Sequence, residues 1–205
     1  MLKCLKVHTG NVDIVKQGIR TMMNLSSCEN DEARKQFIVA GACGVLLECL
    51  ELHNENTGVV KQGLWAMVNL SYKNDEAKRQ FIAAGVCGML LKCLKLYEST
   101  AGVVKRGLRA MANLLSCKNE KVKQQLTAVG VCGVVLQCVE FHGNNVHVVK
   151  QGLRAMVNLL CCGNDEIKQQ FTAAGVCGAV LQYLKLHGDN VYVAKKGLLV
   201  IAYLL

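Results

Sequence analysis

The chain has 205 residues, of which 52% are hydrophobic, 19% charged and 5% aromatic, and its formal net charge is +9. This composition excludes a disordered chain, because there are enough apolar residues to build a core from Leu, Val, Ala, Met and Cys. The absence of proline argues against an all-β fold, and the positive charge favours acidic peptides, nucleic acid or anionic membranes as partners.

The chain carries no signal for membrane insertion or secretion. Its longest apolar run, Phe37 to Leu47, has 11 residues and stops at Glu48, whereas a membrane-spanning helix needs about 20. The N-terminal residues lack the apolar core and cleavage site of a signal peptide. We therefore expect no membrane span and a cytoplasmic protein, with the nucleus as the alternative, in which thiols stay reduced.

A repeat of 44 or 45 residues runs along the whole chain. One glycine series recurs at steps of 45, 44, 45 and 45 residues: Gly18, Gly63, Gly107, Gly152 and Gly197. A fixed period in this range is typical of a solenoid. We predict one array over residues 1–205, with a partial unit 1–29 followed by units 30–73, 74–118, 119–163 and 164–205.

The first helix of each unit has clear start and stop signals. In the unit 74–118, Asn74 is a predicted N-cap, Asp75 and Glu76 lie in the first turn, and Gly85 ends the helix. Asn is a favoured N-cap, acidic residues suit a helix N-terminus, and Gly suits the C-terminal end.

The second helix of this unit, Cys87 to Tyr97, is more apolar. Elsewhere it ends in histidine, whose partial positive charge suits a helix C-terminus: His53, His142 and His187. A polar link leads to the third helix, Val103 to Ser116, with Thr100 as its N-cap. Asparagine holds that cap position in the other units: Asn11, Asn56, Asn145 and Asn190.

The third helix has one wide apolar face. In the unit 30–73 its members recur at helical spacing: Val60, Leu64, Met67, Val68 and Leu70. No strand candidate is found, so the predicted fold class is all-α.

A stripe of polar or bulky residues runs along each third helix. Lys61, Trp65 and Asn69 are spaced four residues apart, so they stand nearly above one another on the helix. Stacked repeats would place such stripes about 10 Å apart. The predicted site comprises these three residues and their equivalents: Lys16, Arg20, Asn24, Lys105, Arg109, Asn113, Lys150, Arg154 and Asn158.

The repeat resembles that of armadillo-repeat proteins over essentially the whole chain. The resemblance is carried by the three-helix unit, by the Ala-Gly pair in FIAAGVCGML and by LWAMVNLS in the third helix. The array is also similar to those of multidomain signalling proteins such as leucine-rich repeat kinases. The resemblance implies a right-handed superhelical armadillo-like α-solenoid, with three helices per repeat of 44–45 residues.

The resemblance also implies a role for the stripe. In this family, Trp and Asn of the third helix line a concave groove and hold an extended peptide, with Asn bonding to the peptide backbone. That role carries over to Trp65 and Asn69 directly. It carries over by repeat position to three further residues, Asn24, Asn113 and Asn158, while arginine replaces Trp65 in three units, at Arg20, Arg109 and Arg154.

The side chains of the stripe suggest a ligand. Asn offers a donor and an acceptor to an extended peptide backbone, and Arg adds a preference for carboxylate or phosphate. We predict a non-enzymatic scaffold that binds an acidic or phosphorylated extended peptide in a basic, Asn-lined concave groove. Two other interpretations stay open: the stripe is only a solvated helix face, or Asn braces the neighbouring repeat.

Further functions follow from the same composition. One is a regulatory repeat segment of a larger signalling protein, such as a kinase or ubiquitin ligase. A nucleic-acid-binding basic solenoid is less favoured, because single strands stack on aromatic residues and Trp65 is the one such residue on the stripe. Since Met1 and Leu205 fall inside predicted helices, the chain is either a fragment of a longer array or self-associates through apolar ends.

The twelve cysteines follow the repeat rather than a metal-site pattern. No C-x-x-C pair is found, so we expect buried thiols, no metal and no cofactor. Three thiols fall near predicted helix ends, where oxidation is an additional hypothesis: Cys28, Cys117 and Cys162. No catalytic constellation is found, and we predict that the chain is not an enzyme.

Overall fold

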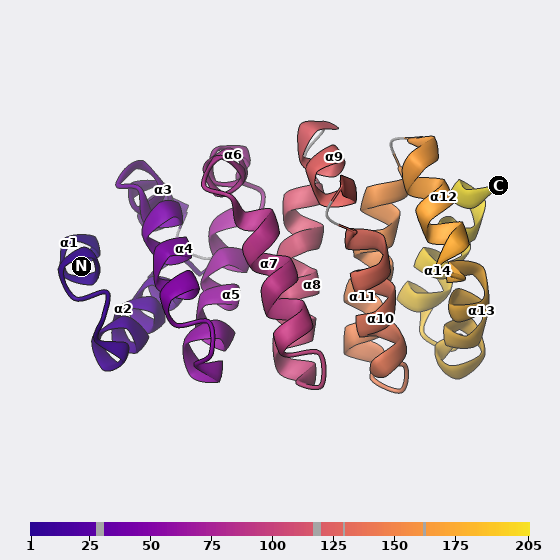
Figure 1. Cartoon of the computed structure of the whole chain (residues 1–205), viewed down its shortest axis with the longest axis horizontal. Helices are drawn as coiled ribbons and strands as arrows, with labels where there is room; N and C mark the ends of the chain where they lie inside the picture. The colour runs from indigo at the N-terminus through magenta and orange to yellow at the C-terminus, as the bar shows by residue number, and fades with distance from the viewer. Residues whose placement is uncertain (28–30, 117–119, 129, 162) are drawn as a thin grey trace. The chain divides into compact units, whose positions relative to one another are not determined.

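The computed structural model describes residues 1–27, 31–116, 120–128, 130–161 and 163–205, which form fourteen helices and no strand (Figure 1). The prediction of an all-α fold is therefore confirmed. The helices are α1 (Leu2–Val7), α2 (Val12–Leu25), α3 (Asp31–Val39), α4 (Ala42–Leu52), α5 (Thr57–Ser71), α6 (Asp75–Ala83), α7 (Val86–Leu96), α8 (Ala101–Leu115), α9 (Glu120–Ala128), α10 (Val131–Phe141), α11 (Val146–Leu160), α12 (Asp165–Ala173), α13 (Val176–His187) and α14 (Val191–Leu204).

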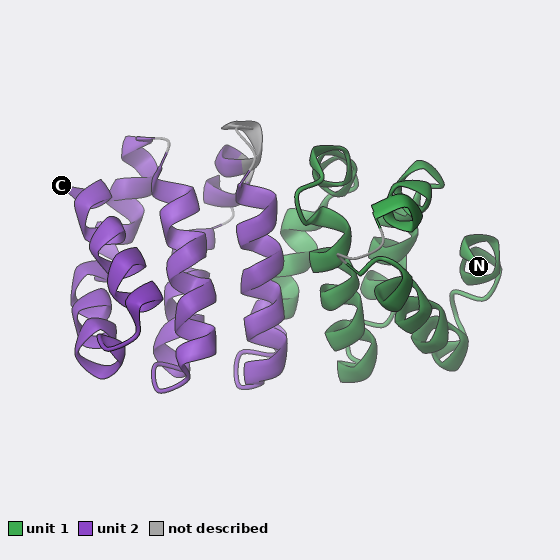
Figure 2. Cartoon of the chain, turned by 180° about the vertical axis from the view of Figure 1, so that it is seen from behind, with its two compact units in different colours: residues 1–93 green, residues 94–205 purple. Residues whose placement is uncertain are grey.

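The helices form two compact units, 1–93 and 94–205, coloured green and purple in Figure 2. In unit 1, the second helices α1 and α4 pack together and the third helices α2 and α5 pack together. In unit 2, α10 packs on α13, and α11 packs between α8 and α14. Within each unit, second helices thus pack on second helices and third helices on third helices, as the three-helix repeat predicts.

Asparagine side chains begin most of the third helices, as predicted. Asn56 Oδ1 accepts hydrogen bonds of 3.1 Å from the backbone N–H groups of Gly58 and Val59. The same arrangement starts three further third helices, at Asn11, Asn145 and Asn190. Thr100 holds the N-cap position of α8, but its side chain makes no cap bond.

The turn between the first and second helices depends on glycine. Gly41 has φ +81° and Gly130 has φ +76°, and this left-handed region is accessible to glycine without the steric cost that a Cβ imposes. The chain can therefore pass from the first helix to the second within two residues, and the second helix packs on the third.

The predicted apolar face of the third helix is buried. In α5, Val60, Leu64 and Met67 have no exposed surface. A glycine lets this face approach the second helix closely, because a Cβ on Gly63 would clash with Leu50 of α4. In unit 2 a Cβ on Gly152 would likewise clash with Val139 of α10.

The repeated histidine connects successive repeats. His53, as predicted, ends the second helix α4, and its Nε2 donates to Thr9 O at 2.6 Å. In unit 2, Nε2 of His142 donates to Glu98 O and Nε2 of His187 to Gly143 O, both at 2.7 Å. Each acceptor belongs to the loop of the preceding repeat, so the residue bonds between repeats in addition to its place at a helix end.

Candidate functional site

The predicted stripes lie on third helices that pack side by side within each unit. In unit 1, Lys16, Lys61, Trp65 and Asn69 are half-buried, whereas Arg20 and Asn24 are exposed. In unit 2, every predicted residue except Asn113 is half-buried: Lys105, Arg109, Lys150, Arg154 and Asn158. The structure thus brings the stripe residues together in two sets, one on α2 and α5 and one on α8 and α11.

The stripe asparagines bond to the neighbouring third helix. Asn69 Nδ2 donates to Met23 O of α2 at 3.0 Å, and Asn158 Nδ2 donates to Ala112 O of α8 at 2.8 Å. These bonds agree with the interpretation that Asn braces successive repeats. The expectation that the same amides hold a peptide backbone stays a prediction.

Asn113 is held more deeply than the others. Only 2% of its surface is exposed, and its Oδ1 accepts a 2.9 Å hydrogen bond from Arg154 Nη2. The bond orients the guanidinium of Arg154 and uses one of its five N–H donors. The bond joins the stripes of α8 and α11, and the peptide-binding roles of Asn113 and Arg154 stay predictions.

The third helices of unit 2 carry positive charge without any carboxylate. Their half-buried and exposed positions include seven cations, which we call the basic face: Lys105, Arg106, Arg109, Lys150, Arg154, Lys195 and Lys196. Neither Asp nor Glu occurs in α8, α11 or α14. Because like charges on one surface add, such a face attracts anions and steers their approach.

The first helices carry acidic residues near their N-termini. Asp165 and Glu166 lie in the first turn of α12, where they complement the helix dipole. In α6, Asp75 accepts a 2.8 Å hydrogen bond from Lys78 Nζ. This bond and the lysine charge lower the pKa of Asp75. These carboxylates lie on a helix type other than the one that carries the basic face.

Four further candidate residues were not among the predicted site residues. Arg106, Lys195 and Lys196 are cations of the third helices, and Tyr192 follows the N-cap of α14. Tyr192 is close enough to Arg154 that the arginine charge acts to lower its pKa, although burial has the larger effect and raises it. Lys195 holds the stripe position of Lys150 one repeat later, and a search of all third-helix positions for charge would have found Arg106 and Lys196 as well.

The cysteines are buried, unreactive thiols at most described positions. Burial raises the pKa of Cys43 and Cys132 to about 12, and that of Cys49 to about 11, so these groups stay protonated at neutral pH. Within the described ranges, no cluster of His, Cys, Asp or Glu could hold a metal ion. The three thiols for which we hypothesised oxidation lie outside the described residues: Cys28, Cys117 and Cys162.

Known proteins share the fold of this chain. No family model and no curated protein matches its sequence. A designed armadillo repeat protein in complex with the peptide (KR)4 is 26% identical, with a TM-score of 0.80, and the match covers 100% of this chain and 80% of the designed one. The chain therefore has an armadillo-like repeat fold, as its sequence predicts.

Two further solved structures support the same fold. An engineered protein is 26% identical with a TM-score of 0.81, and the match covers 98% of this chain and 79% of that one. A computationally designed armadillo repeat protein for modular peptide recognition is 23% identical with a TM-score of 0.80, again over 98% and 79%. None of the described helices combines the length and apolar character that a membrane span requires.

Proposed function

We propose that the chain is a non-enzymatic scaffold that binds an acidic or phosphorylated extended peptide on the basic face. One observation carries the proposal: α8, α11 and α14 hold seven cations and no carboxylate. Grouping like charges opposes folding unless other contacts offset the repulsion, so a function for the charge is a better explanation than solubility alone.

The designed structural neighbour supports a peptide as ligand. That protein was solved with (KR)4, an alternating basic peptide. The present chain has a net charge of +9 and presents lysine and arginine on its third helices. A ligand of the opposite charge, with Asp, Glu or phosphorylated residues, would complement these side chains.

The arginines of the basic face suit carboxylate and phosphate groups. Arg154 uses one Nη2 bond to Asn113, which leaves further N–H donors in the planar fork that pairs with such groups. Lys150 lies one helical turn away on α11. A phosphorylated residue would gain most, because it brings a charge of about −1.5 to −2.

The proposal is tested with a fluorescein-labelled (Glu-Asp)4 peptide and its (Lys-Arg)4 counterpart by fluorescence anisotropy. We expect (Glu-Asp)4 to bind and (Lys-Arg)4 not to bind. The variant Lys105→Glu/Lys150→Glu should weaken binding by at least about tenfold, since each reversed surface charge changes the interaction by about 0.7 kcal/mol and 1.4 kcal/mol is tenfold.

The control variant Lys92→Glu/Lys95→Glu makes the same net charge change on the exposed side of the second helix α7. It should bind like the wild type. Equal loss in both variants would show a general effect of net charge and contradict the proposed face. Preferential binding of a single-stranded oligonucleotide of equal charge would favour the nucleic-acid alternative. The regulatory role in a larger protein stays a prediction.

A further inference from the structure

One tyrosine lies beside the basic face of unit 2. Tyr192 is in the first turn of α14, after the N-cap Asn190, and keeps 37% of its surface exposed. The loop before it is accessible, since Asp189 and its equivalent one repeat earlier, Asn144, are both exposed. A neutral phenol adds nothing to the charge of the face, so its place there suggests a different role.

Cations from two helices lie near Tyr192. Lys196 Nζ, one helical turn further along α14, lies 6.0 Å from the centroid of the Tyr192 ring. Burial raises the pKa of Tyr192, whereas the charge of Arg154 on α11 acts to lower it. Arg154 is therefore within electrostatic reach of the phenol.

The repeat places a third cation beside this tyrosine. Inside unit 1, a Cβ on Gly58 of α5 would lie 3.4 Å from Cε of Lys16 on α2, the preceding third helix. In unit 2, Tyr192 and Lys150 hold these positions at the same separation in sequence. A side chain here thus faces the preceding repeat, and the equivalent residue of α11, His147, is exposed as well.

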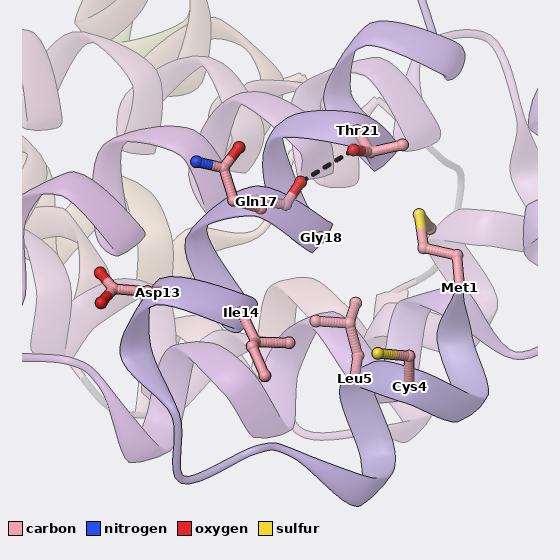
Figure 3. Close-up of a pocket in the computed structure, with 8 residues that line it drawn as sticks. All are labelled: Met1, Cys4, Leu5, Asp13, Ile14, Gln17, Gly18 and Thr21. Carbon is pink, nitrogen blue, oxygen red and sulfur yellow. Dashed lines mark hydrogen bonds between the residues drawn. The ribbon is translucent and has the colours of Figure 1, made fainter.

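A negative charge suits this position of a third helix. In α2 the position holds Asp13, a carboxylate in the first turn of the helix (Figure 3). Such a charge complements the helix dipole. Since neither Asp nor Glu occurs in α8, α11 or α14, whose residues the structure describes throughout, a phosphate on Tyr192 would be the one anionic group on these three helices.

The nearby guanidinium is already oriented. Arg154 Nη2 donates to Asn113 Oδ1 at 2.9 Å, and only 2% of the surface of Asn113 is exposed. This bond uses one N–H of the planar guanidinium. A phosphate brings a charge of about −1.5 to −2 and three acceptor oxygens, so it can pair with the guanidinium and with lysine ammonium groups at the same time.

We propose that Tyr192 is a phosphorylation site that switches the basic face off. The reaction is that of a tyrosine kinase: the phenolic oxygen attacks the γ-phosphorus of ATP, the bond from that phosphorus to the β–γ bridging oxygen breaks, and ADP leaves. The phenolic proton passes to the catalytic base of the kinase. The new phosphate pairs with Arg154, Lys150 and Lys196, which are then occupied. The switch rests on the proposed function, whereas the pairing of the phosphate with these cations does not.

Tyr72 provides a matched control in unit 1. It keeps 36% of its surface exposed and lies 5.5 Å from Lys73 Nζ, but it is the C-cap of α5 and lies outside the basic face. Two chains, with phosphotyrosine incorporated in place of Tyr192 or of Tyr72, therefore carry the same net charge. Circular dichroism of both should match that of the unmodified chain.

The pairing is tested by phosphorus NMR over a pH titration. The second pKa of a phosphorylated side chain is about 6. On Tyr192 it should be lower than on Tyr72 by at least about half a pH unit, because more cations face the phosphate. Arg154→Gln should bring the two values closer together.

The switch is tested by the anisotropy of fluorescein-labelled (Glu-Asp)4. The phosphate on Tyr192 should weaken binding by at least about tenfold, and the one on Tyr72 by less than about twofold, since only the first occupies the basic face. Treatment of the wild type with ATP and a purified tyrosine kinase should reproduce the larger effect. Tyr192→Phe should bind equally before and after the same treatment.

The outcomes separate this inference from the proposed function. An unmodified chain that does not bind (Glu-Asp)4 would contradict the proposed function, and the phosphorus titration would then decide whether the phosphate pairs with the cations. Equal pKa values at the two positions, or an Arg154→Gln variant that changes neither value, would overturn the inference. Equal peptide binding by the two phosphorylated chains, or a Tyr192 that the kinase leaves unmodified, would overturn it as well.

Discussion

Two glycines of one repeat should respond in opposite ways to alanine. Gly152 lies at the contact of α11 with α10, where a Cβ would clash with Cγ2 of Val139. Gly133 lies in the first turn of α10 and is exposed, and apart from its chain neighbours and the backbone of its own helix no atom lies within 4 Å of a Cβ placed on it. The pair therefore separates the effect of packing from that of helix propensity.

The two substitutions should change the free energy of unfolding in opposite directions. Gly133→Ala should stabilise the protein by about 0.4–1 kcal/mol, because alanine restricts the unfolded chain and suits a helix. Gly152→Ala gains the same term, but overpacking costs about 1–3 kcal/mol, and the short, β-branched Val139 has little freedom to move. The net result should be a loss of about 1–2 kcal/mol.

Urea denaturation monitored by circular dichroism measures both changes in stability. A third variant identifies the clash. Removing two methyl groups in Val139→Ala opens space, so Gly152→Ala should cost less in that background than in the wild type. We expect a coupling energy of about 1 kcal/mol or more between the two sites. A stabilising Gly152→Ala, or the absence of coupling, would refute the close approach of α10 and α11.

Three further predictions concern caps, braces and thiols. Asn145→Ala should lower stability by about 1 kcal/mol through loss of the α11 cap. Thr100→Ala should change stability little, because the Thr100 side chain makes no cap bond. Urea midpoints that fall equally in the two variants would contradict this prediction. His142→Ala should cost about 0.5–1.5 kcal/mol with the loss of its bond to Glu98 O, and a loss of protection in hydrogen exchange of that loop would locate the effect. Burial raises the pKa of Cys132 from 9.0 to about 12; its contribution to stability is complete below pH 9 and should decline as the pH rises toward 12, because the unfolded thiol ionises first. Urea denaturation over that pH range, with Cys132→Ala as the control, checks the direction.

Local signals explain why so much of the fold could be predicted. The N-cap at Asn74 and the helix end at Gly85 both depend on residues within one turn. The buried face of α5 follows from helical periodicity alone. Because the signals recur every 44 or 45 residues, the helix boundaries found in one unit also predict those of the other units.

The contacts between repeats could not be predicted in the same way. Whether Asn158 donates to a peptide or to Ala112 O depends on the distance between α11 and α8, which no local pattern contains. His142 was expected at a helix end, but its bond to Glu98 O also requires the loop of the preceding repeat. The boundary between the compact units falls within α7, where no change in composition marks it.

The prediction of the candidate site was incomplete, because it followed a single four-residue spacing. The predicted site includes Lys150 and Arg154 but omits Arg106, Lys195 and Lys196. Lys195 holds the position of Lys150 in the last unit, whereas Arg106 and Lys196 each lie one residue beyond that position on their helices. The total charge of each helix type indicates the basic face better than any single motif.

The most direct test of the central claim locates the bound peptide. A (Glu-Asp)4 peptide that carries a photoreactive benzophenone is cross-linked to the wild-type chain, and the adducts are mapped by mass spectrometry. The account predicts adducts on α8, α11 and α14, which disappear in Lys105→Glu/Lys150→Glu. Adducts concentrated on the second helices α10 and α13, or spread evenly over the chain, would contradict it.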